Sequence, residues 1–268
     1  MSDYFKNCME VLDIQPIKYH QLFEGKSNNA HLFSFDNGKK YIVKFIKEGQ
    51  EKILFNEWIG YSIARYLQLP VPASRFVQIP ESQLSKLTDA KFIKYTDTQF
   101  AIEYIPNCKN AHELTSPNII NLEQLAGIII MDYWLYNQDR TRKNVLFKEE
   151  LEGKHKLIII DHADLFGSFA WESINLPTYS RNLMKSAAHE LIASFIQDEK
   201  EFYNLLSLIQ SIPIHLLNEI VAFTPDDWGI TDDDKKRVVD YLVCRRDMVL
   251  AKLISDFIKV RYRPLHSN

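Results

Sequence analysis

One pattern constrains the fold of this chain more than any other: a polar, basic run that follows an apolar helix and precedes two apolar stretches. The run contains Asp139 and, five positions later, Asn144. Seventeen residues after Asn144, a second apolar stretch leads into Asp161. Residues 145–147 and 157–160 have the composition of two strands joined by a polar tip, which predicts a hairpin. Because Asp139 and Asn144 precede its first strand and Asp161 ends its second, such a hairpin brings the three side chains together.

The spacing of Asp139 and Asn144 is that of the catalytic loop of kinases. In that loop the aspartate orients the attacking hydroxyl and accepts its proton, and the asparagine holds a magnesium ion. Asp161 then lies where a second metal-binding carboxylate is expected. We therefore interpret Asp139 as a candidate catalytic base, and Asn144 and Asp161 as candidate metal ligands.

A lysine and a glutamate in the first part of the chain lie on otherwise apolar faces. The turn 36–38 contains Asn-Gly and predicts a hairpin, whose return strand covers 40–46. Alternation along this strand places Lys44 between two isoleucines. Glu57 lies on the apolar stripe of a helix predicted over 50–68. A buried charge needs a partner, so we expect the two to pair and to position nucleotide phosphates. The alternatives are a lysine at a strand edge and a glutamate that reaches solvent.

Two further stretches are candidates for nucleotide contacts. The polar turn with Gly25, Ser27 and Asn28 precedes the first hairpin, where a phosphate-covering loop is expected. It contains one glycine, so it either directs backbone N–H groups toward an anion or is an ordinary surface turn. A strand predicted to end at Ile105 contains Glu103, and the backbone of both residues is a candidate for binding adenine.

Composition narrows the class of protein. The 268 residues are 46% hydrophobic, which is sufficient for a folded core. A net charge of -3 gives no reason to expect a nucleic-acid or membrane partner. Cys8, Cys108 and Cys244 are too few and too widely separated for a disulfide framework or a zinc site. The chain lacks a long apolar segment. We expect a soluble, cytoplasmic protein.

Other polar residues are expected to have structural roles. Asp132 should accept hydrogen bonds from the loop that follows it. His162 and His189 lack a second ligand at metal-binding spacing, so we expect hydrogen-bonded or surface histidines. Thr231, with Asp234 three residues later, predicts the N-cap of the last long helix.

Several segments resemble the HipA-like kinases, which are similar in fold to the phosphatidylinositol 3- and 4-kinases. The segments are GKSNNAHLF, YIVKF, NEWIG with the following LPVP, NQDRTRKN and IIIDHADLFG. The resemblance implies an α+β fold of two lobes. The small N-terminal lobe, residues 1–107, would hold an antiparallel sheet and a helix, and residues 108–268 a larger, mainly helical lobe.

The resemblance also implies an ATP-dependent kinase that uses Mg²⁺ and most often phosphorylates a protein serine or threonine, including its own chain. By motif match, Asp139 would be the base, Asn144 and Asp161 the metal ligands, and Lys44 and Glu57 the phosphate-positioning pair. The chain departs from the family pattern at Thr141 and Ala163, where histidine and glycine are common. A small-molecule or lipid-headgroup kinase and a nucleotide-binding pseudokinase remain alternatives. The expected partners are a protein substrate or a small regulatory protein.

Overall fold

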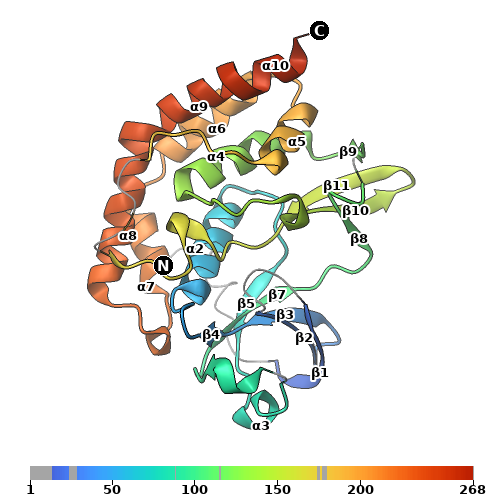
Figure 1. Cartoon of the computed structure of the whole chain (residues 1–268), viewed down its shortest axis with the longest axis vertical. Coiled ribbons are helices and arrows are strands. Elements are labelled where there is room, and N and C mark those ends of the chain that lie inside the picture. The colour runs from blue at the N-terminus through green and yellow to red at the C-terminus, as the bar shows by residue number, and fades with distance from the viewer. Residues whose placement is uncertain are drawn as a thin grey trace.

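The structure is a computed structural model that describes residues 14–23, 29–87, 89–114, 116–173, 176 and 180–267. A small lobe built around one sheet lies at the bottom of Figure 1, and a larger, mainly helical lobe lies above it. This arrangement confirms the α+β class and the two lobes predicted from the sequence. The boundary predicted between residues 107 and 108 stays a prediction. It falls immediately before β8 (Cys108–Asn110).

Within the described residues, five antiparallel strands form the sheet of the small lobe, in the order β1-β2-β3-β7-β5. They are β1 (Pro16–Phe23), β2 (Ala30–Phe35), β3 (Lys40–Lys44), β7 (Gln99–Glu103) and β5 (Ser74–Val77). The predicted β2–β3 hairpin is confirmed, and Gly38 in its turn has a φ of 78°. A positive φ is accessible to glycine without a steric penalty, which is why this turn closes here. The strand predicted to end at Ile105 ends two residues earlier.

The alternation predicted for the third strand is confirmed, although β3 ends before Phe45. Tyr41, Val43 and Phe45 belong to a small apolar cluster within the sheet lobe. On the other side of the strand, Ile42 and Ile46 pack with the large core that continues into the helical lobe. Lys44 is directed to that second side, toward the other lobe. Ile46 itself lies in β4 (Ile46–Lys47), which pairs with β6 (Ile93–Lys94).

Helix α2 (Ile53–Tyr66) runs between the two lobes (Figure 1). Residues 53–64 are all buried, so the single apolar stripe predicted from the sequence is too narrow. The physical reason is that both lobes cover the helix. Its Tyr61 ring packs on Phe100 of the sheet, with centroids 5.6 Å apart. On the other side, Trp58 Nε1 donates to the Ile220 carbonyl, at 2.7 Å.

A second sheet lies at the edge of the helical lobe, in the order β8-β10-β11-β9. The predicted hairpin is formed by β10 (Val145–Leu151) and β11 (Lys154–Ile159), and β9 (Asn118–Ile119) pairs alongside β11. The polar tip predicted over 148–156 is shorter than expected, because its lysines and glutamates continue the strand pairing as half-buried or exposed residues.

Helix α4 (Leu125–Leu135) is the centre of the helical lobe. All eleven of its residues are buried, so the apolar helix predicted before the polar run is present and is covered on every side. Helices α5, α6, α8 and α9 contact it. The helix ends at Tyr136, which has a left-handed φ of 54° and turns the chain into the loop that holds Asp139.

Most of the remaining helices belong to the helical lobe (Figure 1). They are α5 (Ala187–Phe195), α6 (Lys200–Gln210), α7 (Ile214–Ala222), α8 (Asp232–Arg245), α9 (Ala251–Phe257) and α10 (Arg263–His266), with a shorter α3 (Glu81–Leu84) in the small lobe. The predicted N-cap at Thr231 is confirmed, because Thr231 and Asp234 form a reciprocal capping box. In the described part of the chain, no single helix is long and apolar enough to cross a membrane. Helices α6 and α7 meet that criterion by length and composition only when taken together, across a 73° bend.

Candidate active site

The side chain of Lys44 joins the two lobes through two carboxylates. Its Nζ atom donates to Glu57 of α2 and, at 2.8 Å, to Oδ1 of Asp161 beyond β11. The second Glu57 oxygen accepts the backbone N–H of His162 at 3.1 Å. Lys44 is 4% exposed and Glu57 is fully buried, so neither charge is solvated in isolation. The predicted Lys44–Glu57 pair is therefore present, and Asp161 completes a triad.

This triad holds one cation and two carboxylates. Burial and the nearby Asp161 raise the pKa of Glu57 to about 7, although Lys44 opposes the shift. Burial alone would raise the pKa of Asp161, but Lys44 lowers it below the ordinary range. Lys44 itself has a raised pKa, since the two carboxylates outweigh its burial. Asp161 is thus the carboxylate of the triad that stays ionised, so a divalent cation would be attracted to it.

The backbone of Asp161 is in the left-handed region, with a φ of 65°. Residues other than glycine rarely adopt this conformation, and aspartate is among those that tolerate it. Oδ1 of Asp161 also accepts the N–H of Ala163 at 3.2 Å, which holds the carboxylate above its own turn. Such strain, fixed by the surrounding contacts, is common at functional sites.

Asp139 and Asn144 lie on the loop between α4 and β10. Asn144 Nδ2 donates to the carbonyl of Asp139, at 2.8 Å, so its Oδ1 is the atom that could ligate a metal. The backbone N–H of Ile160 donates to the carbonyl of Asn144 at 3.1 Å, which joins the loop to the residue before Asp161. The hairpin therefore brings the three predicted residues to one end of β10 and β11. Asp139 is partly exposed there.

The buried carboxylate of Asp132 holds the loop after α4 in position through hydrogen bonds, as the sequence predicts. It accepts two bonds from Arg140, at 2.8 and 3.1 Å, and one from Asn137 Nδ2, at 3.0 Å. His189 Nε2 lies 2.9 Å from its Oδ2. Burial would raise the pKa of Asp132, but the Arg140 guanidinium and His189 together lower it below its usual range. The carboxylate is ionised and fully bonded, so its role is structural.

Arg140 connects the loop of Asp139 to the segment of Asp161. Its Nη1 donates to the carbonyl of Ile160, at 2.5 Å, and its Nη2 lies 3.3 Å from Nδ1 of His162. His162 is fully buried, and burial lowers its pKa to about 3. It is thus a neutral, hydrogen-bonded histidine, one of the two interpretations the sequence allows. The role of Arg140 is absent from the sequence prediction, although an arginine directly after Asp139 is a signal that could have indicated it.

Asn56 connects helix α2 to the segment after Asp161 through hydrogen bonds. Its Nδ2 donates to the carbonyls of Ala163 and Ser168, at 2.6 and 3.0 Å, and the Trp171 indole donates to its Oδ1 at 2.9 Å. One turn further on, Gly60 lies against the ring of His162. A Cβ atom on Gly60 would be 2.4 Å from His162 Cβ, so only glycine permits this approach. The sequence analysis did not anticipate either contact.

A protein-family model describes what these elements have in common with known chains. The model of the HipA-like kinases matches residues 20–257, which include both lobes and every described site residue above. The chain belongs to the HipA-like kinase family. The family assigned by resemblance is therefore confirmed, and the chain is a kinase by family.

Solved structures show the same fold for this HipA-like kinase. The crystal structure of the Helicobacter pylori proinflammatory kinase CtkA has a TM-score of 0.57 and 14% identity, over 91% of this chain and 96% of that one. The Golgi casein kinase with Mn/ADP bound has a TM-score of 0.54 and 14% identity, over 92% of this chain and 75% of that one. At this identity the likeness shows the fold alone, which is kinase-like as predicted. No curated protein matches the chain.

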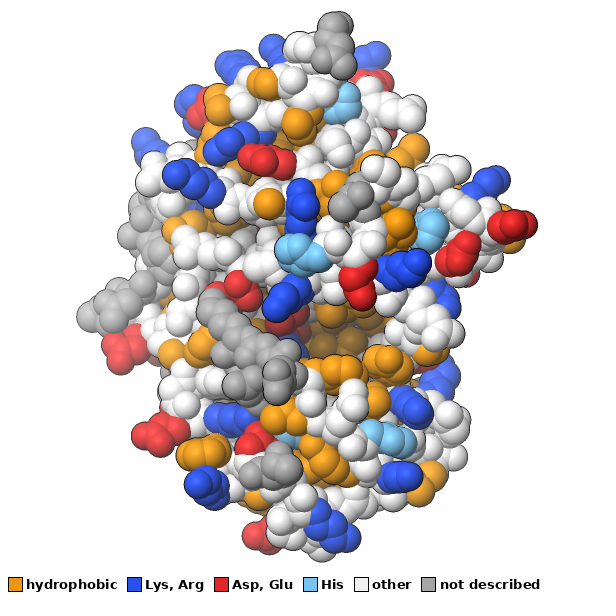
Figure 2. All heavy atoms as spheres, turned by 45° about the vertical axis from the view of Figure 1, so that its right-hand side comes forward, with side chains coloured by type: hydrophobic (Ala, Val, Ile, Leu, Met, Phe, Trp, Pro, Cys, Tyr) orange, Lys and Arg blue, Asp and Glu red, His pale blue; other side chains and the backbone are white. Residues whose placement is uncertain are grey.

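The structure does not test the two other nucleotide contacts predicted from the sequence, the phosphate-covering turn and the adenine-binding strand. Gly25, Ser27 and Asn28 lie outside the described residues. Glu103 ends β7, and its carboxylate pairs with Lys39 at 2.9 Å on the surface, while Ile105 lies beyond the strand in the link to β8. Figure 2 shows a hollow between the upper and lower halves of the molecule, with acidic, basic and hydrophobic side chains around it. The adenine contact stays a prediction.

The metal site of the HipA-like kinase also stays a prediction. No group of three or more histidine, cysteine or acidic residues that could hold a metal occurs among the described residues. Asn144 and Asp161 nevertheless offer an amide oxygen and an ionised carboxylate, the hard oxygen ligands that Mg²⁺ accepts. Mg²⁺ usually takes one or two protein ligands and completes its shell with phosphates and water, so two residues fit this ion.

Proposed function

We propose that this kinase transfers the γ-phosphoryl group of ATP, held with Mg²⁺, to a serine or threonine hydroxyl of a protein, its own chain included. The observation that carries the proposal is the position of Lys44, bonded at once to Glu57 of α2 and to Asp161 beyond β11. In kinases the lysine–glutamate pair and the metal-binding aspartate must both be in place. The Mn/ADP bound to the Golgi casein kinase supports the same ligand classes for this fold.

Each residue of the site then has one task. An ammonium group has three donors, and Lys44 uses two on Glu57 and Asp161, which leaves one for the α- and β-phosphates. Asn144 and Asp161 would hold Mg²⁺, which neutralises the charge that develops on the phosphates during transfer. Arg140 and Asn56 touch no reacting atom in this assignment and keep the two loops in position.

Asp139 is assigned to the acceptor. It accepts the proton of the serine or threonine hydroxyl while that oxygen forms the new bond to phosphorus, and the bond between the γ-phosphorus and the leaving oxygen of ADP breaks. Partial exposure suits this task, because a protein substrate must reach the carboxylate from solvent. The hydrogen bond from Asn144 to the Asp139 carbonyl fixes its backbone.

Mass spectrometry of the purified chain after incubation with Mg-ATP tests the proposal. We expect phosphate on serine or threonine in the wild type and none in Asp139→Asn, with ATP affinity within a few-fold of the wild type in both. Asp240→Asn is the matched control, because Asp240 is an exposed carboxylate on α8. ATP consumption without protein phosphate would indicate a small-molecule or lipid acceptor instead. Nucleotide binding without any turnover would identify a binding module, and turnover by Asp139→Asn at the wild-type rate would remove the base assignment.

A further inference from the structure

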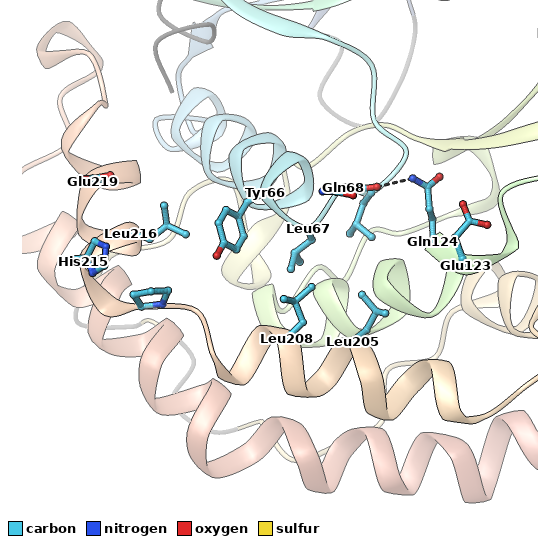
Figure 3. A pocket seen from close by; sticks show the side chains of 12 residues that line it. Tyr66, Leu67, Gln68, Glu123, Gln124, Leu205, Leu208, His215, Leu216 and Glu219 are labelled. Carbon is cyan, nitrogen blue, oxygen red and sulfur yellow. Dashed lines mark hydrogen bonds between the residues drawn. The ribbon is translucent and has the colours of Figure 1, made fainter. Parts of the chain in front are cut away.

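A groove of about 940 Å³ lies at the C-terminal end of α2 (Figure 3), and no residue of the Lys44 triad lines it. It runs between the end of α2, the start of α4 and the bent pair α6–α7. Aliphatic side chains make up half of its lining: Leu67, Leu69, Leu205, Leu208, Pro213 and Leu216. Leu208 is 43% exposed, so this surface is open to solvent.

Glutamates lie at both ends of this groove. Figure 3 places Glu123 at one end and Glu219 at the other, with the leucines between them. In the described part of the chain neither side chain has a hydrogen bond or an ion pair. Glu201, one turn before Leu205 on α6, adds a third carboxylate whose Oε2 is buried without a partner. Burial, Asp198 and Glu123 raise the pKa of Glu201.

The two glutamates of the groove have no ion pair among the described residues. Some other surface acids of the helical lobe do have one, for example Asp233 with Arg237 at 2.7 Å and Glu199 with Arg263 at 3.0 Å. Among the residues that line the groove, His215 is the basic side chain, and the lining includes no lysine or arginine. An apolar floor with uncompensated acids at both ends is complementary to an apolar surface with basic ends.

We propose that this groove is the docking site for an amphipathic helix of a partner protein, with leucine-type residues on one face and lysine or arginine at both ends. Helices bind apolar grooves through residues at helical spacing. Leu205 and Leu208, three positions apart on α6, both line this groove. The acids at the two ends select for basic residues at both ends of the ligand. Docking here does not require the chemistry proposed above.

The groove also touches two helices that support the active site. Gln124, directly before α4, donates its Nε2 to the carbonyl of Gln68 beyond α2, at 2.6 Å (Figure 3). Helix α2 contains Glu57, and α4 leads into the loop of Asp139. A helix in the groove would therefore contact both supports of the site at their far ends.

Two synthetic peptides provide the probes for a test with the full chain. Both are helices of about 14 residues, or roughly 21 Å, with leucine at i, i+3, i+4 and i+7. One has lysine at both ends and the other has glutamate. We expect fluorescence anisotropy to show that the lysine helix binds about five- to ten-fold more tightly, as expected for two exposed ion pairs, and more weakly as salt rises.

Charge reversal of the groove provides the decisive comparison. Glu123→Lys with Glu219→Lys should reverse the preference between the two peptides, and Leu208→Asp should weaken both. Glu150→Lys with Glu152→Lys changes the net charge equally at the exposed β10–β11 tip and should leave the preference intact. Thermal melts check folding, and the single Glu219→Lys chain gives a smaller shift in the same direction if the double variant does not fold.

Each of the following results would overturn the inference. Neither peptide binds, or the preference does not respond to reversal of Glu123 and Glu219, or the control at the hairpin tip reverses it as well. Sedimentation experiments could also show that the wild-type chain is a dimer and that Leu208→Asp makes it a monomer. That result would assign the groove to a second copy of this chain and overturn the proposal of a partner helix.

Discussion

The Nζ atom of Lys44 lies 2.8 Å from Oδ1 of Asp161, a residue 117 positions further along the chain. This contact, with the bond from Lys44 to Glu57, joins strand β3 of the small lobe, helix α2 between the lobes and the end of the β10–β11 hairpin. Because the two carboxylates share one buried cation, loss of Lys44 would leave two like charges together without compensation.

We predict that Lys44→Met and Glu57→Gln each reduce kcat/KM strongly and that their effects are not additive. The two groups belong to one buried network, so a coupling of about 1 to 3 kcal/mol in the barrier is expected. A double-mutant cycle on kcat/KM measures it, with phosphorylation of the chain or of an identified acceptor as the readout.

The exposed pair Arg237–Asp233 on α8 provides the matched control. Its atoms are 2.7 Å apart, but the two side chains are 49% and 59% exposed. Arg237→Met and Asp233→Asn should have small effects that add, since solvent screens exposed pairs. Additive losses at Lys44 and Glu57, in chains that melt at the wild-type temperature, would argue against a catalytic pair.

Asp161→Ala should remove metal-dependent nucleotide binding. The carboxylate is ionised and is the expected bridge between Mg²⁺ and the phosphates, so the affinity for Mg-ATP should fall at least about ten-fold. Calorimetry with ATP, in the presence and absence of Mg²⁺, measures the effect. Asp139→Asn should bind Mg-ATP almost normally in the same assay. Undiminished affinity in Asp161→Ala would end its assignment as a metal ligand.

Gly60→Ala is predicted to destabilise the protein by about 1 to 3 kcal/mol, the usual cost of excess volume in a packed core. The new methyl would overlap Cβ and Cγ of His162, at 2.4 and 2.5 Å, and that buried ring has no room to move. Gly127→Ala is a suitable comparison. Its methyl would meet the tip of Leu69 at 2.5 Å, a flexible side chain that can yield. Urea denaturation should therefore show a clearly smaller loss for Gly127→Ala, and equal losses would contradict the steric explanation.

Acid should destabilise the small lobe through His31. Burial lowers the pKa of His31 to about 4, although Asp89, whose Oδ2 is 3.4 Å from its Nε2, opposes the shift. The unfolded chain, with an ordinary pKa near 6.5, binds more protons below neutral pH. Stability is thus complete above about pH 6.5 and is lost as the pH falls toward 4, by about 1 to 2 kcal/mol at pH 5 from this group.

Urea denaturation at pH 7.5 and 5.0 tests this titration. His31→Phe should lose less stability between the two pH values than the wild type does. His112→Gln, which changes an exposed histidine, should behave like the wild type. An identical acid loss in His31→Phe would show that other groups, such as buried His162, account for it.

The sequence predicted those parts of the site that depend on local periodicity. Alternation placed Lys44 on the correct face of its strand, helical spacing placed Glu57 toward the core, and the hairpin joined Asp139 and Asn144 to the segment of Asp161. Each of these inferences uses residues within one element or its immediate neighbour, where spacing determines direction.

Contacts between distant elements could not be predicted in this way. The approach of Gly60 to His162 depends on how α2 lies against a segment about one hundred residues away, and a glycine within a helix is a weak signal by itself. Helix α4 is covered on every side, because helices that follow it in sequence complete its surroundings. The strand ended at Glu103 rather than Ile105, since apolar composition continues after the pairing with β3 stops.

The bonds of Asn56 determine which inhibitors this kinase can accept. A compound that requires α2 to swing outward must separate the Asn56 amide from the carbonyls of Ala163 and Ser168, and the Trp171 indole from Asn56. Each buried polar group left without a partner costs about 1 to 3 kcal/mol, which such a compound would have to supply from its own binding energy. Ligands that fill only the space between the lobes and leave α2 in place carry no such cost. Screening against this enzyme should therefore favour them.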